Sequence, residues 1–376
     1  MPIRIPFLRL PASQLQLRRE YQRQIAAVVS RGRFILGEEV RAFEKEFAEF
    51  CGARYCVGVG SGTDALFIAL RLSGVRPDQR HEVITSPLTA SFTAHAVVAA
   101  GARPVFADVN PETLLLDPAA AARRCTARTA AIVPVHLYGQ CCDLEAFAAL
   151  ATKTGCALIQ DAAQAHGSEF HGRPVADFSN WVAFSFYPTK NLGCLGDGGA
   201  LLTNQRRLAE QAQRYRDGGR RQGHVAYAEG INSRLDELQA AILRIHLRHL
   251  KAWNQRRAKL AERYDRLLAE RLPEGSVQRV GSAARSDSCH HLYVIRTRER
   301  TRLAAYLRQR GIETGVHYEQ PLHLHPAFRW LGYRRGDFPH AERAAREVLS
   351  LPLHPFLSDR DVDRVAAGIA GFFQRR

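Results

Sequence analysis

Lysine is scarce in this sequence. Five of the 376 residues are lysine and 48 are arginine. A guanidinium group is effectively never deprotonated, whereas an ammonium group partly removed from water can lose its proton and act as a nucleophile. A lysine in a chain that otherwise uses arginine is therefore a candidate for chemistry. Lys190 stands at the corner of a glycine-rich turn in FSFYPTKNLGCLGDGGALLTN (184–204). A solvated loop lysine is the ordinary alternative, so its surroundings must decide.

Three further patterns are missing. No run of eighteen apolar residues occurs, which disfavours a membrane span, and the first residues, MPIRIPFLRLPASQ, lack the pattern of a signal peptide. The eight cysteines include no C-x-x-C pair, so reduced, buried thiols are favoured over disulfides or a zinc site. We therefore expect a cytoplasmic protein with no metal centre and no membrane contact.

The positive charge is large but dispersed. A formal net charge of +16 and a pI near 9.9 raise the possibility of nucleic-acid binding. The arginines are spread along the chain, however, and neither a helix-turn-helix nor a basic arm is recognisable. A diffuse positive field can also concentrate a small phosphorylated substrate. We therefore expect no nucleic-acid partner and treat a DNA-binding regulator as a distant alternative.

Short apolar runs alternate with helical patterns between residues 55 and 204, from YCVGV to GALLT. This alternation predicts an α/β fold with a mostly parallel sheet wrapped by helices. Beyond residue 206 the pattern becomes helical, with one long helix over about 234–270. A strand near HHLYVIR, a helix at RTRLAAYLRQR, and helices near 340 and 360 complete a smaller unit. We expect a large domain over 1–248 and a small C-terminal α/β domain over 249–376.

Ligands bind at the carboxyl ends of the strands in such sheets, where this sequence has Gly60-Ser61-Gly62-Thr63, Asp161 and the segment 185–190. The glycine-rich stretch between a strand and a helix predicts an anion site, with a purely structural turn as the alternative. It also fits G-x-G-x-x-A, but an NAD site needs an acidic residue at the end of the next strand. Thr85 and Ser86 are found there. A phosphate monoester therefore fits better than NAD.

Asp161 ends the apolar run CALIQD. A carboxylate at the edge of a buried strand needs a cation or several hydrogen-bond donors, although a helix cap is its commoner use. Pyridoxal phosphate requires a lysine that forms a Schiff base, a phosphate cradle, and an acid that keeps the pyridine nitrogen protonated. Lys190, the loop at 60–63 and Asp161 supply these three groups.

Six stretches, in this order, carry a family resemblance: GSGTDAL, GARPVFADV, QDAAQAHG, FSFYPTKNLGCLGDGGALLTN, INSRLDELQAAIL and GVHYEQPLHLHP. Together they resemble the DegT/DnrJ/StrS family of nucleotide-sugar aminotransferases that use pyridoxal phosphate. The resemblance covers nearly the whole chain and implies the fold-type-I aminotransferase architecture, here with a seven-stranded sheet in the large domain. It also implies a homodimer whose two active sites are shared between the subunits.

The resemblance assigns cofactor contacts to particular residues. It implies that Lys190 is joined covalently to the cofactor, that Asp161 pairs with the pyridinium nitrogen and that Gln164 reaches the ring hydroxyl. The phosphate would be held by the backbone of Gly62 and Thr63, the hydroxyl of Ser185, and Asn232 of the other subunit. Each assignment is an expectation about this chain.

Residues near the sugar follow from the same resemblance. His317 and Tyr318 are similar to the family's His-Tyr pair, and for His317 a structural role is an equal alternative. Two positions depart from the family: Ala90 stands where an aromatic ring often covers the cofactor, and Glu319 replaces a proline. Stacking on the cofactor must then come from another residue or be weaker.

The implied reaction moves an amino group from L-glutamate, through the pyridoxamine form of the cofactor, to a keto group of a nucleotide-linked deoxysugar, with dTDP or UDP as the nucleotide. The combination of PLTAS, HY and PLHLHP favours a 3-keto sugar, with a 4-keto sugar as the alternative. A related sugar 3-dehydratase carries histidine at the position of Lys190, which argues against that activity. An NAD-linked oxidoreductase stays a distant alternative.

Overall fold

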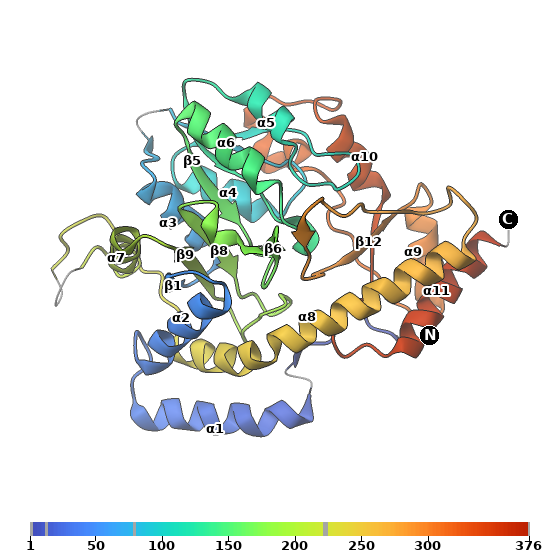
Figure 1. Cartoon of the computed structure of the whole chain (residues 1–376), viewed down its shortest axis with the longest axis horizontal. Coiled ribbons are helices and arrows are strands. Elements are labelled where there is room, and N and C mark those ends of the chain that lie inside the picture. The colour runs from blue at the N-terminus through green and yellow to red at the C-terminus, as the bar shows by residue number, and fades with distance from the viewer. Residues whose placement is uncertain (1–2, 12–13, 78–79, 221–224, 375–376) are drawn as a thin grey trace.

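The computed structural model describes residues 3–11, 14–77, 80–220 and 225–374. Its centre is a seven-stranded sheet (Figure 1). In spatial order the strands are β1 (Tyr55–Val59), β9 (Gly199–Thr203), β8 (Trp181–Ser185), β5 (Ala157–Asp161), β4 (Thr129–Val133), β2 (Glu82–Thr85) and β3 (Arg103–Phe106). Strand β9 is antiparallel to both of its neighbours, and the other pairs are parallel. The predicted α/β fold with a mostly parallel sheet is confirmed.

Both faces of this sheet are covered by helices. The helices are α3 (Gly62–Leu72), α4 (Ser91–Ala99) and α7 (Arg206–Tyr215) on one face, and α2 (Glu38–Phe50) with the first half of α8 (Glu237–Arg271) on the other. Successive side chains of a strand point to opposite faces, and β8 shows the result. Trp181 and Ala183 pack with the first group, whereas Val182 and Phe184 pack with the second. Burial on both faces accounts for the apolar runs that predicted these strands.

Two N-terminal helices were not predicted. Helix α1 (Leu15–Arg31) packs on α8 through Leu17 and Tyr21. Helix α2 buries Val40, Phe43 and Phe47, which follow one another at intervals of three and four residues. That spacing is the pattern of an amphipathic helix, so the sequence did contain a signal for α2.

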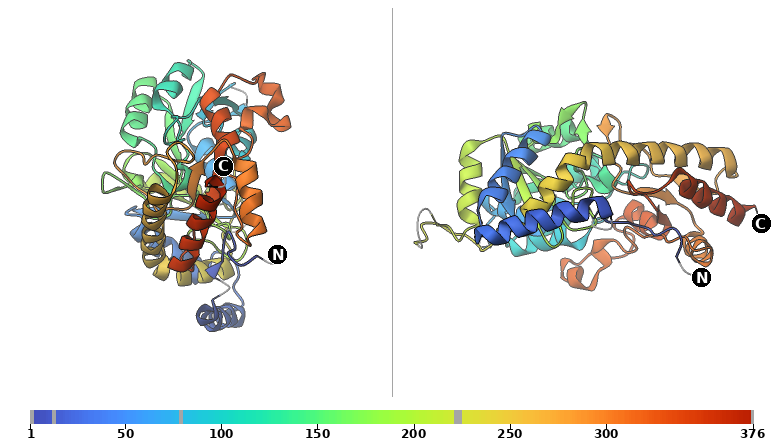
Figure 2. Two further views of the ribbon diagram at one scale, coloured as in Figure 1. Left: turned by 90° about the vertical axis from the view of Figure 1, so that its right-hand side faces the viewer. Right: turned by 90° about the horizontal axis from the view of Figure 1, so that it is seen from below.

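The C-terminal part has its own hydrophobic cluster around a three-stranded antiparallel sheet. The sheet has the order β10 (Gln278–Arg279), β12 (Tyr293–Arg296), β13 (Val348–Leu351) and packs with α9 (Arg300–Gln309) and α11 (Asp359–Phe373). Ile5 joins this cluster and pairs with Ile312, so the first described residues lie at the same end of the molecule as α11 (Figure 2). The domain boundary expected at residue 248 stays a prediction.

Helix α8 connects the two clusters. Its Leu243 and Leu247 pack with the seven-stranded sheet, whereas Leu260 and Leu267 pack with α11 and β12. The predicted helix over about 234–270 is therefore observed as one continuous helix of 35 residues. In Figure 1 it lies above α1 and rises from the lower left toward α11 at the right.

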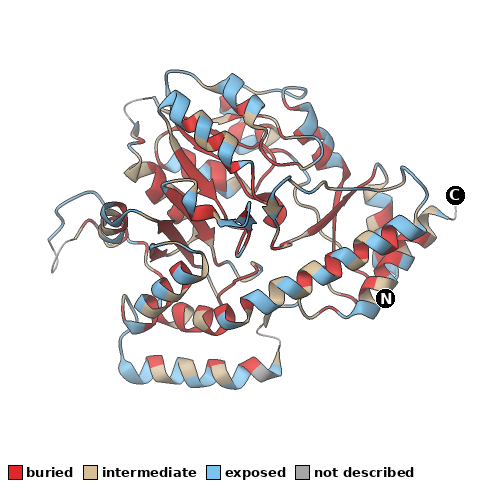
Figure 3. Ribbon diagram, in the orientation of Figure 1, coloured by how far each residue is buried: buried red, intermediate tan, exposed pale blue. Residues whose placement is uncertain are grey.

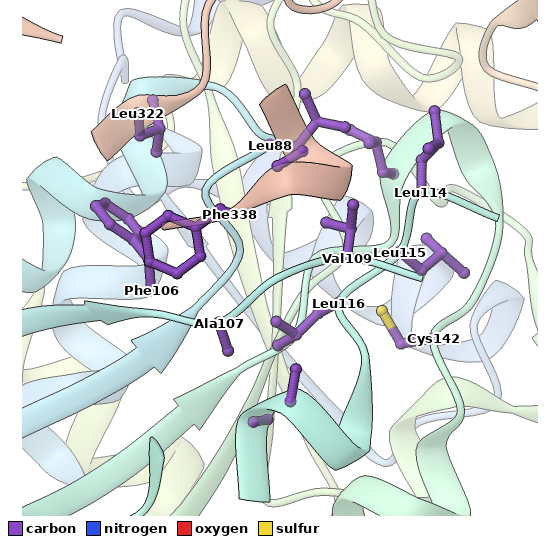
Figure 4. Packing of buried hydrophobic residues seen from close by; sticks show 14 of the residues in the cluster. Leu88, Phe106, Ala107, Val109, Leu114, Leu115, Leu116, Cys142, Leu322 and Phe338 are labelled. Atoms are coloured by element: carbon purple, nitrogen blue, oxygen red, sulfur yellow. The ribbon is translucent and has the colours of Figure 1, made fainter. Parts of the chain in front are cut away.

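Residues from the C-terminal third also cover the β3 edge of the large sheet. Leu322 and Phe338 belong to the same buried cluster as Phe106 of β3 (Figure 4), and the rings of Phe106 and Phe338 meet edge to face at 6.2 Å. The surrounding elements are α5 (Pro118–Arg124), α6 (Leu144–Thr154), α10 (Pro339–Glu347), and the 3-10 helices η5 (Leu322–Leu324) and η6 (Pro326–Leu331). This contact brings the segment that follows Tyr318 to the side of the large sheet.

The remaining elements are short. They are the 3-10 helices η3 (Leu137–Gly139) and η4 (Val175–Asp177) and a second three-stranded sheet of β11 (Ser286–Asp287), β6 (Glu169–Phe170) and β7 (Arg173–Pro174). Across the described ranges, each helix is too short or too polar to cross a bilayer.

Candidate active site

The loop between β1 and α3, called the anion cradle below, has the geometry expected of an anion site. Ser61 caps α3, and its hydroxyl accepts a hydrogen bond from the Asp64 N–H at 3.1 Å. The first turn of a helix presents N–H groups without intrahelical partners and the positive end of the helix dipole. A Cβ atom on Gly62 would lie 2.6 Å from the Cβ of Ser185. Glycine therefore allows the first turn of α3 and the end of β8 to lie in close contact, which brings the N–H groups of that turn near the Ser185 hydroxyl, and such donors suit a phosphate.

Lys190 lies in the turn that follows β8. The turn is closed by a hydrogen bond from the Lys190 N–H to the Tyr187 carbonyl at 2.9 Å. The side chain is partly buried, and this desolvation lowers the pKa of its amine to about 8, although the charge of Asp161 acts in the opposite direction. An appreciable fraction of Lys190 is thus neutral, and hence nucleophilic, near neutral pH. This environment favours the chemical interpretation of Lys190 over a solvated loop lysine.

Asp161 is at the carboxyl end of β5 and is only 5% exposed. Burial raises the pKa of its carboxyl group, while the Thr93 hydroxyl, the Ala163 N–H and the charge of Lys190 act to lower it. The Thr93 hydroxyl donates to Oδ2 at 2.8 Å and the Ala163 N–H donates to Oδ1 at 3.1 Å. Both oxygens are therefore oriented, and a cationic ligand group beside them would favour the charged form.

Gln164 is held from two sides. Its Oε1 accepts a hydrogen bond from the Tyr138 N–H at 2.7 Å, and its Nε2 donates to the Tyr318 hydroxyl at 3.1 Å. The Tyr138 hydroxyl in turn donates to the carbonyl of His317. An amide nitrogen carries two hydrogens, so Gln164 keeps one N–H that can be offered to a ligand. Tyr138 was not singled out from the sequence, because its contribution depends on distant contacts.

His317 and Tyr318 lie near Lys190 and Asp161. Burial and the charge of Lys190 lower the pKa of His317 to about 4, so the ring is neutral near neutral pH. Its Nδ1 is 2.9 Å from the Ser350 hydroxyl, and its ring stacks on Phe7 at 5.7 Å. Burial also raises the pKa of Tyr318 to about 12, with a further contribution from the charge of Asp161. The two residues therefore border the same site, and His317 also has a structural contact.

Asn232 is exposed, in the segment between α7 and α8. It forms an isolated antiparallel bridge with Asp217, and the next residue, Ser233, is hydrogen-bonded to the N–H of Gly60. Asn232 is therefore fixed one residue away from a contact with the anion cradle. Thr63 lies in the first turn of α3, in the cradle itself.

Besides Tyr138, two residues of the site were not predicted from the sequence. Thr93 orients Asp161, and Ser233 contacts the glycine-rich loop; hydroxyl side chains in a helix and a loop carry no sequence signal for such roles. Ala90 is the N-cap of α4. The nearby ring of Phe92 is exposed and contacts His95, with ring centroids 6.5 Å apart.

Two other features of the described residues do not indicate competing chemistry. The acidic residue of β2 is Glu82, at the start of the strand, where its carboxylate pairs with Arg128 at 2.6 Å. Glu82 therefore lies at the opposite end of β2 from the acidic residue that would bind an NAD ribose. A cavity of about 640 Å³ lies between the second half of α8 and residues 272–294. It is bordered by Tyr138 but by none of the predicted site residues, and volume alone does not indicate catalysis.

Comparison with known proteins agrees with the family resemblance found in the sequence. A model described as the DegT/DnrJ/EryC1/StrS aminotransferase family matches residues 15–370. A dTDP-3-amino-3,4,6-trideoxy-alpha-D-glucose transaminase of Streptomyces venezuelae is 44% identical over 372 residues, which cover 99% of this chain and 97% of the relative.

Two further similarities extend this result. A protein named pleiotropic regulatory protein from Geobacillus stearothermophilus is 42% identical over 370 residues, covering 98% of this chain and 99% of the relative. The crystal structure of S. venezuelae DesV in complex with a ketimine intermediate superposes with a TM-score of 0.95 at 42% identity, and each chain is covered completely.

Proposed function

The chain belongs to the DegT/DnrJ/EryC1/StrS aminotransferase family, and from this premise we propose that it transfers an amino group from L-glutamate to a nucleotide-linked keto-deoxysugar. We infer a 3-keto sugar carried by dTDP or UDP, because the S. venezuelae relative is named for a 3-amino sugar. The observation that carries the proposal is Lys190, whose pKa is lowered to about 8 beside the Asp161 carboxylate and the anion cradle.

The residues of the site fit pyridoxal phosphate. When bound, this cofactor supplies an electron sink and carries the amino group between donor and acceptor. Gly62, Thr63 and Ser185 would hold its phosphate in the cradle, where a Cβ on Gly62 would collide with Ser185. Asp161 would pair with its ring nitrogen, and the free N–H of Gln164 would reach its ring hydroxyl.

Lys190 has two tasks in this proposal. Its Nζ would hold the cofactor covalently and, once released as a free amine, would move a proton from the donor carbon to the C4′ carbon of the cofactor. Both tasks need a neutral amine, which burial makes available near pH 8. Asp161 would keep its negative charge while Nζ moves the proton, because Thr93 and Ala163 donate to its two oxygens and the protonated ring nitrogen would favour the charged form. His317 and Tyr318 would contact the sugar.

We further propose a homodimer in which Asn232 reaches the cofactor phosphate of the other subunit. Apolar side chains are exposed close to Asn232: Phe34 is 46% exposed and Tyr227 is 68% exposed. The Phe34 carbonyl accepts a hydrogen bond from the Glu237 N–H, and Ile35 is bridged to Asp236, so this loop lies beside the segment of Asn232. Helix α1 also exposes its outer face (Figure 3). A second copy of the chain would cover this surface.

We place the enzyme in the cytoplasm, because all eight cysteines are free thiols, as expected in a reducing compartment.

The proposal is tested by incubating the purified protein, pyridoxal phosphate and L-glutamate with a panel of 3-keto and 4-keto sugars linked to dTDP or UDP. We expect one 3-keto sugar to be converted, and NMR of the product to show nitrogen at carbon 3. Amination at carbon 4 would contradict the regiochemistry. Failure to form 2-oxoglutarate from glutamate at any pH would contradict the transaminase itself, and the Lys190→Arg variant gives the background.

A further inference from the structure

The hydroxyl of Ser233 connects two parts of the anion cradle. Its Oγ accepts a hydrogen bond from the Gly60 N–H at 2.9 Å and donates one to Oδ2 of Asp64 at 2.7 Å. Gly60 precedes the cap of α3, and Asp64 lies in the first turn of that helix. One side chain from a segment some 170 residues later in the sequence thus joins both ends of the loop 60–64.

Ser233 is itself held rigidly. It is only 3% exposed, and its N–H donates to the carbonyl of Arg216 at 2.9 Å. The guanidinium of Arg216 is buried, bonds the carboxylate of Glu44, and donates to the Gly58 carbonyl at 2.6 Å. Oε1 of Glu44 also accepts the Gly58 N–H at 2.8 Å. Ser233 therefore belongs to a buried network that runs to β1 just before the cradle.

We propose that Ser233 is a positioning residue for the phosphate of the cofactor. Its hydroxyl fixes Gly60 and Asp64, and thereby sets the direction of the N–H groups in the first turn of α3. It acts through the loop and does not touch the phosphate. This inference rests on the proposed function, because it takes the cradle to be the phosphate site.

Removing the Ser233 hydroxyl leaves two groups of the loop without this hydrogen-bond partner. In Ser233→Ala the Gly60 N–H loses its acceptor and the Asp64 carboxylate loses a donor. A partly buried N–H without a partner is costly, so the loop would rearrange to recover one. The cradle would then be less well organised for an anion, while the environments of Lys190 and Asp161 stay the same.

The test is a titration of the cofactor-free protein, followed by absorbance, with two ligands: pyridoxal 5′-phosphate and pyridoxal, which lacks the phosphate. Ser233→Ala should bind pyridoxal 5′-phosphate about tenfold more weakly than the wild type. Its affinity for pyridoxal should be unchanged. A residue with only a structural role would weaken both ligands alike, and that result would overturn the inference.

Ser179 provides a matched control. Its hydroxyl also accepts one hydrogen bond, from Nε2 of Gln160 at 2.7 Å, and donates one, to the Trp181 carbonyl at 2.9 Å. It lies at the amino end of β8, the opposite end from Ser185. Ser179→Ala should lose a comparable amount of thermal stability and keep the wild-type affinity for both ligands.

A second pair of variants keeps the inference testable if Ser233→Ala does not fold. Asp64→Asn and Asp64→Ala both remove the negative charge, but only asparagine keeps an acceptor for the Ser233 hydroxyl. Asp64→Asn should bind pyridoxal 5′-phosphate at least about threefold more tightly than Asp64→Ala, with no difference for pyridoxal. Equal affinities for the phosphate ligand would contradict the role of Ser233.

The outcomes also separate this inference from the proposed function. If the wild-type chain does not bind pyridoxal 5′-phosphate, the proposed function fails and the positioning role fails with it. If the wild type binds and Ser233→Ala binds equally well, the positioning role alone is wrong.

Discussion

Lys190 is neutral more often than an ordinary lysine because partial burial disfavours its charged form. Only the neutral amine attacks an aldehyde, so its covalent capture of pyridoxal phosphate should become faster as the pH rises and level off above about 8. The charge of Asp161 raises the pKa of Lys190, so Asp161→Asn should move the midpoint of this pH–rate profile to lower pH. Borohydride trapping and peptide mass spectrometry would give the rate and the site of attachment.

Two lysine-to-arginine variants serve as controls for this prediction. Lys190→Arg should give no trapped product and no transamination, because arginine cannot form the imine. Lys251→Arg, which changes an exposed lysine of α8, should behave as the wild type. A midpoint of the pH–rate profile near the pKa of a free lysine would contradict the assignment of Lys190.

Thr93 orients the Asp161 carboxylate through the hydrogen bond of its hydroxyl at 2.8 Å. Thr93→Val has a similar shape but lacks this donor. We expect turnover to fall about tenfold and the pKa of Asp161 to rise further, because the hydroxyl stabilises the charged form. The pH profile of the half-reaction with glutamate should show both effects. Thr93→Ser should restore the rate; if it does not, packing of the methyl group is the cause.

At the scale of elements, the first turn of α3 depends on Gly62. Alanine is a better helix former than glycine, so Gly62→Ala should stabilise α3 if nothing else changed. Its Cβ, however, would lie 2.6 Å from the Cβ of Ser185, and β8 and α3 must move apart. We expect a lower thermal midpoint and at least about tenfold weaker binding of pyridoxal phosphate, measured by calorimetry and by titration.

Gly281 is the matched control for this change. An added Cβ there would meet its nearest neighbours, atoms of Glu112, at 3.4 Å, which is ordinary contact. Gly281→Ala should therefore leave cofactor binding unchanged. If Gly62→Ala also binds the cofactor normally, the cradle is wider than the proposed phosphate site requires.

The elements that the sequence predicted well are those buried on both faces. Strand β8 and helix α8 could be located because Val182, Phe184 and Leu243 belong to apolar patterns long enough to recognise. Strand β4 ends at Val133, earlier than the run AAIVPV suggested, since Pro134 cannot donate a ladder hydrogen bond. Strand β13 was missed because its four residues form a short run between two helices.

The site was predictable where chemistry restricts the residue type. A nucleophilic lysine, a strand-end carboxylate and a glycine-rich cap each carry a local signal, which is why Lys190, Asp161 and Gly62 could be chosen before the structure. Thr93 and Ser233 could not, because their roles depend on partners 68 and 173 residues away.

At the scale of the whole molecule, the proposed exchange of Asn232 between subunits allows two inactive variants to rescue each other. In a heterodimer of Lys190→Ala with Asn232→Asp, one site would receive both changes and the other neither. The aspartate would repel the phosphate, so the Asn232→Asp homodimer should be inactive at limiting cofactor. Subunits that are unfolded together and refolded should recover up to about one working site per heterodimer, measured as transaminase rate.

Two outcomes would contradict this arrangement. If Asn232 serves its own subunit, each site of the heterodimer carries one lesion and the mixture stays inactive. If Asn232→Asp alone is fully active at limiting cofactor, the residue does not contact the phosphate in either subunit.

Helix α8 limits how this chain can be recombined with its relatives. A continuous helix of 35 residues is about 50 Å long, and each of its halves fills a different hydrophobic cluster. A chimaera joined inside the helix, between Leu250 and Leu260, would take the first cluster from one parent and the second, except for Ile5, from the other, so each cluster would keep matched side chains. Crossovers placed just after Leu272 would instead separate Leu260 and Leu267 from the side chains of β12 and α11 with which they pack. Exchange of sugar specificity by shuffling should therefore succeed first with crossovers inside the helix.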